Sequence, residues 1–136
     1  SHEVVDLLII MLGTNDVKER LGANAACIAI GMERLARKAQ SVDCWGDHGP
    51  NILIVCPPPI RPEMERAECG VPMGRGCLEK SRELPRYLEK SARLVGAHFL
   101  DAKDCEFNAV DGMHLTRKGH GQLARMLAQE VPKLIP

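Results

Sequence analysis

Residues 4–16 read VVDLLIIMLGTND, a run of apolar side chains that ends in a polar tip. Strands covered by helices on both faces are nearly continuous apolar runs, so we predict a buried strand of a parallel sheet over residues 4–12. In open α/β sheets, ligands bind beyond the carboxyl ends of the strands. We therefore expect Asn15, which follows this strand, at the rim of a binding site.

Helical and strand patterns alternate along the rest of the chain. Short apolar runs predict strands over 51–56 and 97–101. Helical spacing predicts helices over 25–40 (Ile28, Met32, Leu35 and Ala39), over 77–95 (Leu78, Leu84, Leu88 and Leu94) and from an N-cap at Thr116 to Pro132 (Leu123, Met126, Leu127 and Val131). Pro85 is expected to kink the second helix or delay its start.

This alternation implies parallel strands joined by right-handed crossovers, a three-layer α/β/α sandwich. Three strands make a thin sheet, and the first apolar run begins at residue 4, so we expect N-terminal β-α units of the fold to be missing. The 136 residues are expected to form a single, partial domain, because 45% hydrophobic content allows a core that buries roughly two-thirds of the unfolded surface at this length.

Charge and aromatic content argue against two classes of partner. The 18 basic and 18 acidic residues cancel, and only 3% of residues are aromatic, so neither a nucleic acid nor a membrane is expected as a partner. The longest apolar block is too short to span a bilayer, and the start resembles no secretion signal. We expect a cytoplasmic protein.

Six cysteines are present, but no two lie within seven residues of each other. That spacing does not fit a zinc ribbon or a redox motif, so small core hydrophobes in a reducing compartment are the favoured interpretation. A scattered metal site or a disulfide remains the alternative. We predict no cofactor.

The segment Asp111-Gly112-Met113-His114 places a carboxylate three residues before an imidazole. A loop with this spacing lets Asp111 hold the Nδ1 proton of His114 and leaves Nε2 as a base. Together with the Asn15 amide as an oxyanion donor, the pair supplies two of the three elements of acyl transfer. Each residue is also a common turn former, so the pattern is informative only in combination.

The third element, a nucleophile, has no obvious candidate. None of the serines follows a strand that leads directly into a helix, where a hydroxyl would be exposed; they are Ser1, Ser41, Ser81 and Ser91. Cys56, at the end of a predicted strand, is the best-placed thiol but a weak candidate. The remaining histidines lack a carboxylate at comparable spacing and are predicted to be non-catalytic; they are His2, His48, His98 and His120.

GTND at the end of an apolar strand and DGMH before the last helix resemble two blocks of the GDSL-type, or SGNH, hydrolases. The arylesterase/acyltransferase branch is the most similar, since the Pro-Pro-Pro segment after the second strand and the Phe99-Leu100-Asp101-Ala102 strand also fall in family order. The resemblance implies a flavodoxin-like fold and an esterase site with Asn15 as oxyanion donor, His114 as base and Asp111 as its orienting group. The family's Gly-Asp-Ser block has no counterpart here.

Three hypotheses follow. The chain is the larger part of a serine esterase or acyltransferase for short-chain carboxylic esters, with the serine supplied by a complementary N-terminal fragment or an assembly partner. Alternatively, it is an inactive truncated module that self-associates as a homo-oligomer through the exposed edge of its first strand. A metal-dependent hydrolase that uses Asp111, His114 and a cysteine ranks last. The connection from Pro57 to Met73, with Ile60, Met64 and Val71, is expected to roof an acyl pocket.

Overall fold

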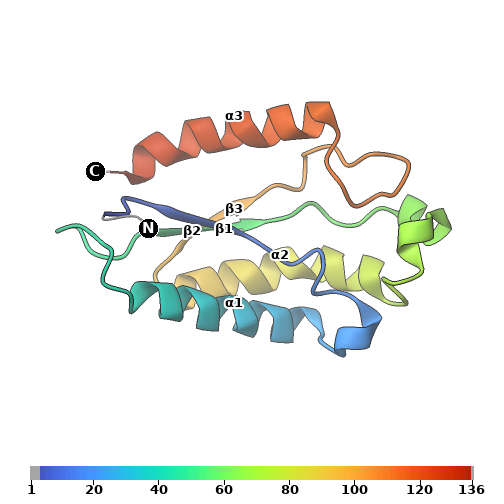
Figure 1. Cartoon of the computed structure of the whole chain (residues 1–136), viewed down its shortest axis with the longest axis horizontal. Helices are drawn as coiled ribbons and strands as arrows, with labels where there is room; N and C mark the ends of the chain where they lie inside the picture. The colour runs from blue at the N-terminus through green and yellow to red at the C-terminus, as the bar shows by residue number, and fades with distance from the viewer. Residues whose placement is uncertain (1–3, 136) are drawn as a thin grey trace.

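A computed structural model describes residues 4–135, apart from the side chain of Cys69. Three parallel strands form one sheet in the order β1-β2-β3. The strands and long helices are β1 (Leu8–Met11), α1 (Ala25–Gln40), β2 (Ile52–Cys56), α2 (Cys77–Leu94), β3 (His98–Asp101) and α3 (Arg117–Leu134). Helices α1 and α2 cover one face of the sheet and α3 covers the other (Figure 1). The predicted α/β/α architecture with a parallel sheet is confirmed.

Strand β2 lies at the centre of the sheet, and all five of its side chains are buried. Ile52, Ile54 and Cys56 belong to the larger apolar cluster beneath α1 and α2. Leu53 and Val55, which alternate with them, belong to the smaller cluster beneath α3. Burial on both faces explains why this strand is an uninterrupted apolar run.

The first strand is shorter and more exposed than the sequence predicts. β1 covers only Leu8–Met11 and pairs with β2 alone, so it is an edge of the sheet in the described chain. Ile10 is buried, but Ile9 is 39% and Leu12 is 52% exposed. The prediction of a buried strand over 4–12 was wrong. An apolar run indicates side chains that favour burial, but it does not show whether neighbouring elements cover them.

Helix α1 begins at its N-cap Asn24, whose side chain accepts the N–H of Cys27 at 2.9 Å. Ile28 and Met32 are buried as expected, whereas Leu35 is 41% exposed and Ala36 takes its place against the core. In α2, Leu84 and Leu88 are buried and Leu94 is 58% exposed. The two errors share a cause: the buried stripe of each helix is narrower than its apolar pattern.

Two prolines lie inside helices. Pro85 lies in the middle of α2, which starts at Cys77 without the predicted delay. Helix α3 continues past Pro132 to Leu134, so the expected stop at that proline was wrong. The last turn is held from outside the helix, because the Nδ2 group of Asn51 donates to the carbonyl of Leu134 at 2.7 Å. At the other end, Thr116 is the predicted N-cap and accepts the N–H of Gly119 at 2.9 Å.

Short 3-10 helices fill the connections η1 (Glu19–Leu21), η2 (Pro62–Arg66) and η3 (Glu68–Gly70). In the described part of the chain, no helix combines the length and the hydropathy needed to cross a bilayer. The connections after β1, β2 and β3 all begin at the carboxyl end of the sheet, on the right in Figure 1. That end therefore gathers three loops from distant parts of the sequence.

Candidate functional site

Asp111 and His114 meet in the loop between β3 and α3. Oδ2 of Asp111 lies 3.0 Å from Nδ1 of His114, and Oδ1 accepts the backbone N–H groups of Met113 at 2.8 Å and His114 at 3.0 Å. One carboxylate thus fixes both the ring and the backbone of the histidine. The predicted contact between the two side chains is present.

The electrostatics of the loop keep Asp111 ionised. Partial burial opposes its charge, but the N–H groups of Met113 and His114 and the His114 ring outweigh that effect and hold the pKa of Asp111 well below its usual range. The side chain of Asp111 is 20% exposed and that of His114 is 75% exposed. A negatively charged and largely buried carboxylate therefore contacts an imidazole that is open to solvent.

Gly112, between the two residues, fixes the path of this loop. Its φ is +67°, and a Cβ atom there would lie 3.0 Å from the carbonyl oxygen of Arg61 and 3.0 Å from the backbone nitrogen of Met64. The N–H of Arg61 donates to the Gly112 carbonyl at 3.0 Å. Glycine is required for both the left-handed backbone and the close approach. The loop is thereby fastened to the segment that follows β2.

Asn15 lies in the turn that follows β1, and because the strands are parallel this turn begins at the same end of the sheet as the loop after β3. The N–H of Asp16 donates to Gly13 and the N–H of Lys18 donates to the Asn15 carbonyl, and the Asn15 side chain is exposed. Among residues 4–135, no hydrogen bond joins Asn15 to Asp111 or His114. The structure brings Asp111 and His114 into direct contact, and Asn15 lies in a separate turn that also follows the carboxyl end of a strand.

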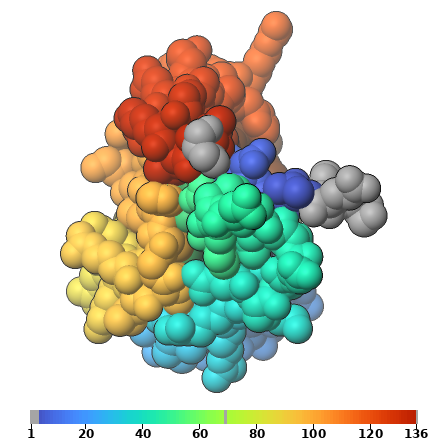
Figure 2. Space-filling view, turned by 90° about the vertical axis from the view of Figure 1, so that its left-hand side faces the viewer, coloured from blue at the N-terminus to red at the C-terminus, as the bar shows by residue number. Residues whose placement is uncertain are grey.

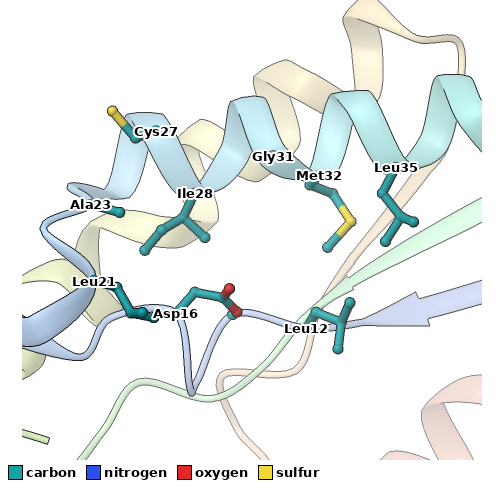
Figure 3. A pocket seen from close by; sticks show the side chains of 10 residues that line it. Leu12, Asp16, Leu21, Ala23, Cys27, Ile28, Gly31, Met32 and Leu35 are labelled. Carbon is teal, nitrogen blue, oxygen red and sulfur yellow. The ribbon is translucent and has the colours of Figure 1, made fainter.

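An apolar pocket of about 340 Å³ opens beside the Asn15 turn. Figure 3 shows Ile28, Met32 and Leu35 of α1 directed toward Leu12 and the Asp16 carboxylate. No residue pattern indicates this cavity, because its two walls are a turn and a helix face that meet only after folding.

The segment after β2 does not roof a pocket in the expected way. Ile60, Met64 and Met73 are each only 2% exposed and belong to the main core, whereas Val71 is 84% exposed. The expectation that Ile60, Met64 and Val71 form an acyl-pocket roof was therefore wrong for the first two. They anchor the segment to the core, because apolar side chains in a long connection are buried wherever the core reaches them.

The serines of the described chain are all engaged away from His114. The hydroxyl groups donate to the Lys38 carbonyl, the Leu78 carbonyl and the Glu33 carboxylate, from Ser41, Ser81 and Ser91 respectively. Cys56 is fully buried, and burial together with the nearby Asp101 raises the pKa of its thiol to about 12. Such a thiol is protonated and inaccessible, so Cys56 does not fit the role of nucleophile. Ser1 lies outside the described residues.

A second histidine-carboxylate pair was missed by sequence reasoning. Nε2 of His48 lies 3.7 Å from Oδ1 of Asp6, before the amino ends of β2 and β1. The two residues are distant in the sequence, so spacing alone could not reveal them. This pair lies at the opposite end of the sheet from His114. His2 lies outside the described residues.

The cysteines described in the structure are free thiols: Cys27, Cys44, Cys56, Cys77 and Cys105. No group of three or more potential ligands among histidine, cysteine, aspartate and glutamate gathers within the described residues. A metal site built on Asp111, His114 and a cysteine therefore has no geometric support in that part of the chain.

No protein-family model matches the chain, and no curated protein shows significant sequence similarity. Solved structures do match. The aryl esterase of M. smegmatis is 32% identical with a TM-score of 0.87, and this chain spans 98% of its own length and 63% of that protein's. A carbohydrate acetylesterase family member from Sinorhizobium meliloti is 29% identical (TM-score 0.85, 98% and 63%), and a putative arylesterase from Agrobacterium tumefaciens str. C58 is 35% identical (TM-score 0.81, 96% and 62%).

These structural neighbours are carbohydrate acetylesterases and arylesterases with the SGNH hydrolase fold, so the resemblance predicted from GTND and DGMH is confirmed. The chain spans less than two-thirds of the length of each of these three proteins.

Proposed function

We propose that this chain, which has the fold of the SGNH esterases, contributes the base, its orienting carboxylate and an oxyanion donor to a serine esterase for short-chain carboxylic esters. The observation that carries the proposal is the 3.0 Å contact between Asp111 Oδ2 and His114 Nδ1, at the carboxyl end of a parallel sheet. Esterase neighbours at TM-scores of 0.81 to 0.87 support the reaction class.

The proposed reaction has two steps. His114 Nε2 takes the proton of a serine hydroxyl while the serine oxygen attacks the ester carbonyl, and the Asn15 amide donates a hydrogen bond to the resulting oxyanion. His114 then returns the proton to the leaving alcohol, and an acyl-serine forms. Water or another alcohol, deprotonated by the same imidazole, attacks the acyl-serine, and the imidazole returns that proton to the serine oxygen as the acyl group leaves as an acid or a new ester.

The serine is proposed to come from a segment other than the described residues, either a complementary N-terminal fragment or a partner in an assembly. The outer edge of β1 is open, and a strand added there in the parallel direction would end at the same rim as Asn15. A groove of about 450 Å³ runs along residues 4–9 and the end of α3. Figure 2 shows the start of the described chain, in blue, at the side of the molecule next to α3.

The apolar pocket beside Asn15 is the proposed acyl site. Its volume suits a small acyl group, and apolar side chains with one carboxylate form its wall. We also propose that the protein is cytoplasmic and that it can transfer the acyl group to alcohols as well as to water.

Intact-mass spectrometry and fluorophosphonate labelling of the purified protein test the proposal. The expected result is a covalent adduct together with hydrolysis of a short aryl acetate. A single 15.0 kDa species that takes no label would overturn it.

A second candidate is an inactive module that self-associates through β1. The observation in its favour is the exposed edge strand, where Ile9 is 39% exposed. Sedimentation distinguishes the candidates, because self-association without esterase activity supports the module. A stable monomer that lacks esterase activity contradicts both.

A further inference from the structure

Asn108 lies six residues before His114, and its side chain contacts the backbone of both members of the Asp111–His114 pair. Oδ1 accepts the N–H groups of Val110 at 2.9 Å and Asp111 at 2.8 Å. Nδ2 donates to the carbonyl of His114 at 3.0 Å. The side-chain amide of Asn108 therefore accepts a hydrogen bond from Asp111 and donates one to His114.

The backbone of Asn108 strengthens the same arrangement. Its N–H donates to the His114 carbonyl at 2.8 Å, and its carbonyl accepts the N–H of Gly112 at 3.0 Å. The neighbouring residues Phe107 and Leu115 form an antiparallel bridge that closes the base of the loop. Asn108 is thus the point at which the two arms of the loop are joined.

We infer that Asn108 is the positioning residue that sets the distance and angle between the Asp111 carboxylate and the His114 ring. The Asp111–His114 pair has little apolar packing on its solvent side, where Val110 is 83% exposed and the His114 side chain is 75% exposed; on the inner side, Met113 packs against the main core. Its geometry therefore depends on hydrogen bonds, and a histidine's tautomer is set by the partner of the other ring nitrogen. If Asp111 is displaced, Nδ1 of His114 loses its hydrogen-bond partner and the tautomer of the ring is no longer fixed.

The amide type matters, not only the size of the side chain. Aspartate at this position would still accept the N–H groups of Val110 and Asp111. It could not donate to the His114 carbonyl, and it would place a second negative charge beside Asp111. Asparagine is the residue of this size that satisfies all three groups.

The catalytic meaning of this inference rests on the proposed function, but its test does not require turnover. The ¹⁵N shifts of the His114 ring report the tautomer at about pH 9, where an ordinary imidazole is neutral. We expect the wild-type protein to hold the proton on Nδ1, and Asn108→Ala to convert this single tautomer into a mixture. Asn51→Ala is the control, since it also removes a side-chain amide with two backbone contacts, at the other end of the sheet.

Asn108→Asp keeps the chain foldable if the alanine variant is not, and it should give a smaller but measurable tautomer shift. A wild-type tautomer ratio in folded Asn108→Ala, or in Asn108→Asp if the former does not fold, would overturn the inference. An equal shift in Asn51→Ala would also overturn it. In a preparation with esterase activity, Asn108→Ala should lower kcat about 100-fold, the cost of a misplaced catalytic group.

Failure of the two proposals can be told apart. A protein with no fluorophosphonate label but an Asn108-dependent tautomer would refute the esterase and leave the positioning role standing. A labelled protein with an unchanged tautomer in both Asn108 variants would support the esterase and refute the positioning role of Asn108.

Discussion

Asp111 holds His114 at two points, through Oδ1 on its backbone N–H and through Oδ2 on its ring, both at 3.0 Å. The first contact fixes where the residue lies, and the second fixes how the imidazole is turned. A carboxylate that accepts several hydrogen bonds is stabilised in its charged form. The same contacts therefore affect both the chemistry and the stability of the loop.

Asp111→Asn is predicted to lower stability in a pH-dependent way. The folded-state pKa of Asp111 is depressed, so its charge stabilises the fold above the unfolded-state pKa of about 3.9, and this contribution is lost as the pH falls below that value. Urea unfolding should show the variant less stable than wild type at neutral pH. The difference should shrink below about pH 4. A difference that grows on acidification would contradict this account.

Asn15→Ala is predicted to reduce esterase turnover without reducing stability. Removal of one oxyanion donor costs about 100- to 1000-fold in kcat, and the exposed Asn15 side chain makes little contribution to the fold. Asn24→Ala is the matched control, because it removes the N-cap of α1 and should cost about 1 kcal/mol of stability while leaving kcat unchanged. If the two variants exchange these effects, the assignment of Asn15 is wrong.

Gly112→Ala is predicted to destabilise the fold more than Gly49→Ala. Both glycines have a left-handed backbone, with φ of +67° and +73°, which costs an alanine about 1–2 kcal/mol. A Cβ at residue 112 also meets the backbone of Arg61 and Met64 at 3.0 Å, whereas nothing lies within 4 Å at residue 49. Thermal unfolding of the two variants measures the difference, and equal losses would show that the loop yields freely to the added methyl group.

Ile9→Lys is predicted to abolish association at the open edge of β1 while leaving the fold intact, since this side chain is already 39% exposed. Charges on an edge strand oppose pairing with another strand. Ile30→Lys is the control, because Ile30 is 47% exposed on α1, away from the strand edge. Sedimentation of both variants provides the measurement. Unchanged association in Ile9→Lys would place the contact elsewhere.

The element order was predictable because β2 is a continuous apolar run and α1 and α2 have apolar residues at helical spacing. It overestimated β1, since an apolar run does not reveal which neighbours cover a strand. Leu35 is exposed and Ala36 is buried because the buried stripe of α1 is narrower than its apolar pattern. The last turn of α3 accepts a hydrogen bond from Asn51, which belongs to a different part of the chain.

The Asp111–His114 contact was predictable because three residues of spacing suffice for it. Asn108 could not be found in the same way, because its partners are backbone groups that no residue pattern identifies. The pairing of His48 with Asp6 and the pocket between Leu12 and α1 both require contacts across the fold. Short-range geometry was accessible from the sequence, and long-range geometry was not.

We propose that His114, held by Asp111, is the base of a serine esterase. The most direct test is the rate of fluorophosphonate labelling in His114→Ala compared with His48→Ala, which removes the second carboxylate-paired imidazole found among residues 4–135. We expect labelling to be lost in His114→Ala and retained in His48→Ala, with the adduct on a serine other than Ser41, Ser81 or Ser91. Labelling that survives in His114→Ala would contradict the proposed role of His114.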